Sequence, residues 1–392
     1  MSAEASAHTV VFGAASAQNL RLTATKIALF LEGKAGVPLA EACAMLAERA
    51  APGAFRASIT GTDRADLVRR LRELAATDDA SLPMASEPPR LVFLFSGPDS
   101  AWSGMGARLC AASSVFRDAT EECLALFRDR GLDVGEGFAS TPDTGPERLY
   151  PRFFAYQYAL ARAWAHCGVQ PDVVLGYSLG ELAAYAVAGA IALRDAVAIV
   201  HEYGRLCSEH AGEGELLSVV ARPQELQRAL GDAPWDDEAR GVAVSIHMGD
   251  SVRVVSGAPH SIAALQAELR GKRIFSTKVG HVPIAAHSAR ARALGEELAA
   301  RVGLIATHPP AIRVMTTQAG RLLEAEDIDA DFWARWVSTP LDVGAAVDAV
   351  LFEGPAFFLE VGPHPSVHAV VERIVEERGA PAGRGSTACS AR

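Results

Sequence analysis

The sequence lacks three features, and each absence excludes a class of protein. Among its 392 residues no run of about 18 apolar residues is free of charge, so no membrane span is expected. The six cysteines form no Cys-x-x-Cys pair, which argues against a metal site or a disulfide framework and favours a reducing cytoplasm. The formal net charge is −10, whereas nucleic-acid-binding proteins are usually basic. We therefore expect a cytoplasmic protein without metal, membrane or nucleic-acid ligands.

The composition that remains is that of a globular protein. Hydrophobic residues make up 49% of the chain, enough for a sizeable core, and the length suggests two or three folded units. Residues 1–90 are expected to form a small α/β domain that ends in the proline-rich segment Thr77–Arg90. Its expected elements are strands at Thr9–Phe12 and Phe55–Thr60 and helices at Leu20–Leu31, Leu39–Leu46 and Arg64–Ala75.

Beyond residue 90 the pattern predicts a parallel sheet with helices on both faces. Continuous apolar runs, typical of strands buried on both sides, alternate with long helical segments. These runs are Leu91–Phe95, Val173–Leu175 and Phe357–Leu359. The core is expected to span residues 91–212 and 281–378.

Residues 213–280 interrupt this core. Their expected elements follow the order strand, helix, strand, strand, helix, strand, which predicts a ferredoxin-like subdomain. The tail, residues 379–392, is rich in Gly, Ala, Pro and Ser and is expected to be disordered.

The segment Gly176-Tyr177-Ser178-Leu179-Gly180 is a Gly-x-Ser-x-Gly motif between a buried strand and a helix. In that context a sharp turn lifts the serine out of the sheet, as in an α/β-hydrolase-like core. The helix N-terminus that follows directs free N–H groups at a developing oxyanion. We therefore predict that Ser178 is a nucleophile. The alternative is a glycine-framed turn that carries a solvated serine.

A serine hydroxyl needs a base at neutral pH, and eleven histidines are available. His287 is the preferred candidate because it ends an apolar approach, Val282–Ala286, where the chain leaves the insertion. From the residues alone, His281 and His364 remain open as alternatives.

Four motifs in order then make the sequence recognisable. They are Phe95–Gly106 (FSGPDSAWSGMG), Gly176–Glu181 (GYSLGE), Ile284–His287 (IAAH) and Phe358–Pro365 (FLEVGPHP). Together they resemble the acyltransferase domains of modular polyketide synthases and the malonyl-CoA:carrier-protein transacylases of fatty-acid synthesis. Residues 1–90 resemble the linker between the ketosynthase and the acyltransferase in those synthases.

The resemblance implies a ping-pong transfer without a permanently bound cofactor. Ser178 would attack the thioester of an acyl-CoA or acyl-phosphopantetheine while His287 takes the proton. A phosphopantetheine thiol of an acyl carrier protein would then collect the acyl group, and a ketosynthase is a second expected partner. Asp342, in the segment that matches a family motif, is expected to orient His287 through its carboxylate or its backbone carbonyl.

Carrier proteins are usually acidic, so docking one on this acidic chain requires a local basic patch. Arg69, Arg70 and Arg72 form a candidate cluster. The favoured interpretation of this cluster is nevertheless a solvated helix face.

The sequence departs from the family at the position that grips a substrate carboxylate. Family members that take malonyl groups have an arginine 25 residues after the serine, where this chain has Tyr203. Arg205 lies two residues further, which on a helix turns it about 200° away. A buried malonyl carboxylate would then lack its counter-charge. We therefore expect a neutral acyl substrate; a malonyl enzyme with another cation is the alternative.

Two further departures lie beside the serine. Pro98 stands where a family glutamine offers a backbone N–H to the oxyanion, and proline has none. The expected donors are therefore the N–H groups of Leu179 and Asp99. Tyr177 replaces the histidine that usually precedes the serine and should reshape the pocket. The expected pocket residues are Tyr177, Tyr203, Pro98, Ile284 and Ala286.

Two other functions compete with transfer. A hydrolase that clears acyl groups from carrier proteins would share the serine and histidine and would also lack the arginine. A non-catalytic scaffold is favoured by Pro98 alone.

Overall fold

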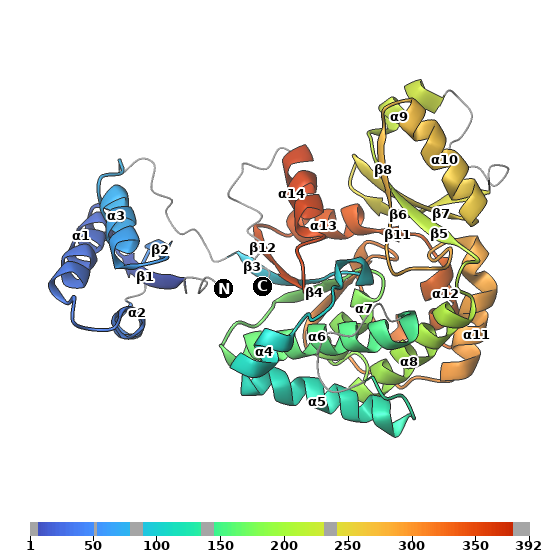
Figure 1. The fold of residues 1–392 in the computed structure, drawn as a ribbon, viewed down its shortest axis with the longest axis horizontal. Helices are drawn as coiled ribbons and strands as arrows, with labels where there is room; N and C mark the ends of the chain where they lie inside the picture. The colour runs from blue at the N-terminus through green and yellow to red at the C-terminus, as the bar shows by residue number, and fades with distance from the viewer. Residues whose placement is uncertain (1–6, 51–52, 79–88, 135–144, 231–240, 379–392) are drawn as a thin grey trace. The chain divides into compact units, whose positions relative to one another are not determined.

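A computed structural model describes residues 7–50, 53–78, 89–134, 145–230 and 241–378 (Figure 1). The chain divides between Pro89 and Arg90 into two compact units. The expected disordered tail lies outside the described residues.

The N-terminal unit is a two-stranded antiparallel sheet packed against helices. Its elements are β1 (His8–Ala14), α1 (Ala17–Gly33), α2 (Leu39–Glu48), β2 (Phe55–Gly61) and α3 (Arg64–Ala75). Buried side chains alternate along β1 and recur at helical spacing on α1 and α3, which produces a separate small core.

The arginine cluster on α3 is paired within this unit. Arg69 and Arg70 both contact Asp66, and Arg69 also contacts Glu73 at 2.6 Å. Arg72 contacts Glu32 on α1 at 2.7 Å. These ion pairs are exposed, so this face is a mixed-charge helix surface rather than a basic patch.

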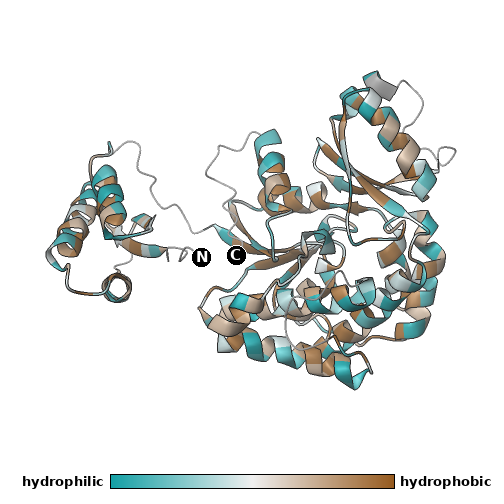
Figure 2. Ribbon diagram, viewed as in Figure 1, coloured by the Kyte–Doolittle hydropathy of each residue, from teal (hydrophilic) through white to brown (hydrophobic). Residues whose placement is uncertain are grey.

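The second unit is built on a five-stranded sheet in the order β10-β9-β4-β3-β12 (Figure 1). Four of its strands are parallel, and the short β10 pairs antiparallel at the edge. The strands are β3 (Arg90–Phe95), β4 (Val173–Gly176), β9 (Arg313–Thr316), β10 (Arg321–Leu322) and β12 (Ala356–Val361). The central strands are brown in Figure 2 because apolar side chains point to both faces of the sheet.

Helices cover both faces of this sheet: α13 and α14 lie on one side, and α5 to α8 lie on the other (Figure 1). The helices of the core are α4 (Ala107–Ala112), α5 (Ser114–Asp129), α6 (Pro146–His166), α7 (Gly180–Ala188), α8 (Leu193–Glu209), α11 (Arg292–Val302), α12 (Phe332–Ser338), α13 (Val343–Phe352) and α14 (His368–Glu377). Short 3-10 turns occur at Pro98–Ser100, Ala289–Ala291 and Ala325–Asp327.

The inserted segment forms a second sheet with two helices on one face. Its elements are β5 (Glu215–Val220), α9 (Pro223–Leu230), β6 (Val242–Met248), β7 (Val252–Gly257), α10 (Pro259–Gly271) and β8 (Phe275–Lys278). The sheet order is β11-β6-β7-β5-β8, where β11 (Leu341–Asp342) comes from the core and pairs parallel to β6. The strand β11 was not expected from the sequence.

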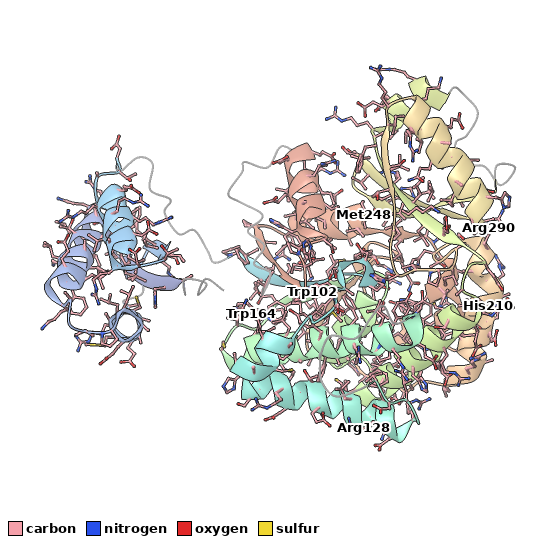
Figure 3. The ribbon with its side chains drawn as sticks, in the orientation of Figure 1. Trp102, Arg128, Trp164, His210, Met248 and Arg290 are labelled. Carbon is pink, nitrogen blue, oxygen red and sulfur yellow. The ribbon has the colours of Figure 1, made fainter. Side chains whose placement is uncertain are left out.

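The two faces of this small sheet have different partners. Leu217, Val219 and Val255 belong to a core beneath α9 and α10. Leu216 and Met248 belong instead to the main core of the unit, and Figure 3 labels Met248 between the small sheet and α14. Successive side chains of a strand point to opposite faces of its sheet. The small sheet therefore packs against α9 and α10 with one face and against the main core, near β4, with the other.

None of the described helices is both long enough and apolar enough to cross a bilayer. Within the same residues, no group of three or more His, Cys, Asp or Glu side chains is arranged to hold a metal ion.

Candidate active site

Ser178 lies on the turn between β4 and α7. Its φ is 53°, a left-handed conformation that costs energy for a non-glycine residue. The glycines around it make the turn possible. A Cβ on Gly176 would lie 2.5 Å from Glu181 Cα, and a Cβ on Gly180 would lie 2.3 Å from the Phe95 carbonyl oxygen. The motif is therefore required by backbone packing, and it presents the serine at the carboxyl end of the sheet.

His287 lies opposite this turn, on the segment that returns from the small sheet. Its Nε2 is 3.0 Å from Ser178 Oγ, within the distance needed for proton transfer. Its backbone N–H donates to the Val337 carbonyl at 2.6 Å, and its φ is 59°. Both side chains are buried, with 7% of Ser178 and 1% of His287 exposed. A nucleophile and a base are thus held together away from bulk water.

Burial dominates the electrostatics of His287. It lowers the pKa of the imidazole to about 4, while the backbone carbonyls of Trp336 and Thr339 act in the opposite direction. Nδ1 makes no hydrogen bond of standard geometry. The two carbonyls therefore raise the pKa of the imidazole without forming a regular hydrogen bond to it. The imidazole is therefore neutral near pH 7 and is free to accept the serine proton.

The carboxylate of Asp342 does not orient His287, which corrects the expectation from the sequence. Asp342 Oδ1 accepts the backbone N–H of Ala345 at 2.8 Å and caps the N-terminus of α13. The Asp342 N–H donates to the Thr317 carbonyl. The carbonyls that act on the imidazole belong to Trp336 and Thr339 instead of Asp342.

The two alternative histidines lie elsewhere. His281 is exposed, and its carbonyl accepts the Tyr150 hydroxyl at 2.8 Å. His364 is also exposed. Neither lines the cavity that Ser178 and His287 share.

Glu181 and Trp336 support His287 from behind, and the sequence analysis did not select either residue. Glu181 is fully buried, and its Oε2 accepts the Trp336 indole N–H at 2.8 Å. Its Oε1 accepts the Thr317 N–H at 3.0 Å and the Thr317 hydroxyl at 2.8 Å. The Trp336 ring meets the imidazole edge to face, with centroids 6.3 Å apart. A single carboxylate on the otherwise apolar helix α7 was the available signal.

Burial is the main influence on the Glu181 carboxyl and raises its pKa, while the hydrogen bonds from Thr317 and Trp336 act to lower it. Two of its donors, a backbone N–H and an indole N–H, cannot act as acceptors. The surroundings of Glu181 are thus built for a carboxylate that accepts on both oxygens.

Ser178 and His287 open into a cavity of about 140 Å³. One wall comes from the turns at the carboxyl ends of the core strands, and the other comes from the small sheet. The lining residues are Pro98, Asp99, Tyr177, Ser178, Leu216, Ser218, Ile246, Met248, Val252, Val254, Val279, Val282, His287, Ser366 and Val370. None of these described lining residues is an arginine or a lysine.

Three expected pocket residues do not line this cavity. Tyr203 is closed off between Tyr150, with ring centroids 5.5 Å apart, and Trp336, at 5.0 Å. Its buried ring forms an aromatic cluster with those of Tyr150 and Trp336 in the core and does not reach the cavity. Ile284 and Ala286 are buried as well, because their segment packs against the backbone of the loop before β5.

Tyr177 and Asp99 do line the cavity, and they contact each other. The Tyr177 hydroxyl donates to Asp99 Oδ1 at 2.7 Å. Burial raises the pKa of the Asp99 carboxyl, and the hydrogen bond from Tyr177 acts to lower it. Asp99 is exposed and lines the cavity, whereas Pro98 beside it lines the same cavity but is buried.

The two N–H groups expected to stabilise the oxyanion, those of Leu179 and Asp99, differ in whether they are already engaged. No described hydrogen bond uses the Leu179 N–H, which leaves it available at the N-terminus of α7. The Asp99 N–H instead lies against its own carboxylate and helps to lower that pKa.

Comparison with known proteins identifies the family. The family described as "Acyl transferase domain" matches residues 92–388. The chain belongs to this family. It is 34% identical over 380 residues to erythronolide synthase EryA2 of Saccharopolyspora erythraea, a match that covers 94% of this chain and 10% of that protein. It is 30% identical over 374 residues to polyketide synthase GfsE of Streptomyces halstedii, covering 92% of this chain and 10% of that protein.

Solved structures agree with the sequence relatives. The acyltransferase domain from module 8 of the salinomycin polyketide synthase matches with a TM-score of 0.82 at 25% identity, covering 97% of this chain and 91% of that one. A loading acyltransferase from the avermectin modular polyketide synthase matches with a TM-score of 0.69 at 31% identity, covering 76% and 93%. The acyltransferase resemblance and the mixed α/β class expected from the sequence are thereby confirmed.

The chain is therefore an acyltransferase domain of the polyketide-synthase type. It spans about a tenth of the length of the two curated relatives described above.

Proposed function

We propose that this domain transfers a short acyl group without a free carboxylate from a thioester to the phosphopantetheine thiol of an acyl carrier protein. Ser178 carries the acyl group between the two thiols, and His287 moves the protons. The observation that carries the proposal is the 3.0 Å approach of His287 Nε2 to Ser178 Oγ, inside a cavity whose described lining residues include no arginine or lysine.

In the first half-reaction, Ser178 Oγ attacks the thioester carbonyl carbon while its proton passes to His287 Nε2. The carbon–sulfur bond breaks, and the departing sulfur takes the proton from His287. In the second half-reaction, the carrier thiol gives its proton to His287 and attacks the ester carbonyl. The proton then returns to Ser178, so both groups are regenerated. No permanently bound cofactor takes part in either half.

The Leu179 N–H is the donor best placed to stabilise the oxyanion. It belongs to the residue after the nucleophile and points from a helix N-terminus. Pro98 cannot supply the second N–H that the family resemblance leads one to expect. Loss of one such donor costs roughly 10² to 10³ in rate, so we expect slow acylation.

The lining of the cavity supports the exclusion of dicarboxylic acyl groups. A malonyl carboxylate there would be desolvated beside Asp99 and would find no guanidinium or ammonium among the described lining residues. The avermectin relative is a loading acyltransferase, and its 31% identity exceeds the 25% of the salinomycin module 8 domain. A malonyl transferase would require a cation that the described lining residues do not offer.

Intact-mass spectrometry of the protein after incubation with a panel of acyl-CoA thioesters tests the proposal. Acetyl-, propionyl- and butyryl-CoA should each add one acyl group, and Ser178→Ala should abolish the addition. Preferential loading of malonyl- or methylmalonyl-CoA would overturn the assigned substrate class. Failure of Ser178 to react with a fluorophosphonate would favour a non-catalytic scaffold.

A second candidate is hydrolysis of acyl groups from carrier proteins, which the lack of an arginine among the described lining residues favours as much as transfer. The two functions differ in whether water reaches the acyl-serine. Apolar side chains from the small sheet, such as Met248 and Val254, line the cavity and limit that access. The lifetime of the acyl-serine with and without a carrier thiol separates the functions: rapid loss without the thiol would identify a hydrolase.

A further inference from the structure

Asp99 is the acidic residue among the described residues that line the cavity. Most of the wall around it is apolar, made of valines, leucine, isoleucine and methionine from the small sheet and the loops beside it. Ser96, Gly97, Pro98 and Ser100 are all buried, whereas Asp99 between them is exposed to the cavity. The loop therefore presents one carboxyl group to whatever occupies the space beside Ser178.

The loop that carries Asp99 is fixed from behind. The Gln157 side-chain amide donates to the Ser96 carbonyl at 2.9 Å and to the Val361 carbonyl at 3.1 Å. The Ser100 hydroxyl donates to the Gly97 carbonyl at 3.0 Å. These buried contacts hold the turn in one conformation, so Asp99 is preorganised before substrate arrives.

Tyr177 fixes the carboxyl itself. Its hydroxyl donates to Asp99 Oδ1, and its ring packs so closely that a Cβ on Gly97 would lie 2.8 Å from it. Apart from Tyr177 and its own N–H, Asp99 has no described hydrogen-bonding partner. The nearby titratable group that favours its charged form is His281, which is exposed and does not line the cavity.

The Asp99 carboxyl lines the cavity and has one described side-chain partner, Tyr177, so it can accept further hydrogen bonds from an occupant of the cavity. The chemistry that satisfies it is a hydrogen-bond donor, whereas a second carboxylate would add repulsion. A donor on the acyl chain would enter the same cavity as the thioester carbonyl.

We propose that Asp99, positioned by Tyr177, selects acyl groups that carry a hydrogen-bond donor, a hydroxyl or an amino group, and rejects those with a free carboxylate. This inference rests on the proposed function and adds the specificity-determining residue and the substrate class. The cavity of about 140 Å³ limits the chain to a short one, since an apolar cavity of about 150 Å³ accommodates a benzene-sized ligand.

Competition among short acyl thioesters tests this inference. The panel contains butyryl, methylmalonyl, and butyryl chains with a hydroxyl or an amino group at C2, C3 or C4, all as CoA thioesters. Acyl-Ser178 formation is measured by intact mass over time. For the wild type, at least one hydroxylated or aminated chain should exceed butyryl about tenfold or more, the ratio expected from a hydrogen bond to a charged group. The hydroxyl and amino arms distinguish the two sources of the donor.

Two variants separate selection from folding. Asp99→Asn should lose most of the advantage of the preferred substituted chain, and Tyr177→Phe should reduce it by releasing the carboxyl. Asp118→Asn, an exposed aspartate on α5, is the matched control and should behave as the wild type. Fluorophosphonate labelling of Ser178 reports whether each variant retains a folded site.

The outcomes distinguish this inference from the proposed function. Equal loading of butyryl and every substituted chain by the wild type, with butyryl still forming acyl-Ser178, would overturn the inference and leave the transferase in place. Unchanged ranking in a labelled Asp99→Asn variant would do the same. If no thioester acylates Ser178, the proposed function itself fails. Because the wild-type ranking needs no variant, the test stands even if Asp99→Asn does not fold.

Discussion

Replacement of Asp342 separates two roles that one aspartate could have in this site. In the structure its carboxylate caps α13 through the Ala345 N–H at 2.8 Å. Asp342→Ala should therefore lower the free energy of unfolding by about 1 kcal/mol, the usual cost of an N-cap lost to alanine. Acylation of Ser178 should change by no more than a few-fold, because the carboxylate has no described contact with His287.

Asp342→Ser is the matched variant, since serine caps a helix but has no carboxylate. It should keep near-normal stability in urea unfolding followed by tryptophan fluorescence, and it should acylate at a near-normal rate. A catalytic triad predicts a very different result, because loss of its carboxylate lowers kcat by roughly 10⁴. A fall of that order in Asp342→Ser, with stability retained, would refute the assignment of Asp342 as a cap alone.

The remaining predictions concern the base, its support and the turn. Burial lowers the pKa of His287 to about 4, so the acylation rate should persist below pH 6.5 and fall only near pH 4 in a pH–rate profile; a midpoint near 6.5 would contradict the buried imidazole. Because unfolded histidine binds its proton near pH 6.5 and the folded one near 4, this group should remove stability as pH falls between those values, and His287→Gln should flatten that slope in urea titrations. Glu181→Gln should present an amide N–H to the Trp336 indole N–H, costing about 1–3 kcal/mol in urea unfolding and slowing acylation; an unchanged rate would show that Glu181 does not position the base. Gly180→Ala should prevent folding, since its Cβ would lie 2.3 Å from a carbonyl oxygen of β3, whereas Gly271→Ala, with open space around it, should be neutral in the same expression and thermal-melting assays.

Much of the fold was predictable because its strongest signals are local. The apolar runs before the Gly-x-Ser-x-Gly turn and near the C-terminus correspond to β4 and β12 within about a residue or two. The strands β9, β10 and β11 were not found. Leu341–Asp342 is too short to show any periodicity, and it becomes a strand only because β6 lies beside it. The strand conformation of Leu341–Asp342 thus depends on pairing with a distant segment, which no local sequence pattern encodes.

Some residues of the active site could likewise be identified from the sequence, and others could not. Ser178 stands in a motif whose glycines are dictated by backbone contacts, so it could be found from the residues alone. An aspartate that caps a helix and an aspartate that orients a histidine look alike in sequence. The role of Asp342 therefore became clear only from its contact with the Ala345 N–H in the structure. Tyr203 was expected in the pocket from its position in the chain, but helix α8 turns its ring into the aromatic cluster.

The departures from the family motifs are physically linked at one wall of the cavity. The Tyr177 hydroxyl is buried and needs a partner, and Asp99 supplies one at 2.7 Å. Replacing Asp99 by an apolar residue would leave the buried Tyr177 hydroxyl without this partner, at a cost of about 1–3 kcal/mol. Tyr177 therefore depends on Asp99, and Gly97 must stay a glycine to admit the tyrosine ring. With these residues present, His287 Nε2 still lies 3.0 Å from Ser178 Oγ. A coupled substitution of this kind alters what the cavity accepts while leaving the attack geometry intact, which is the reason to seek the specificity of this domain at Asp99 rather than at Tyr203.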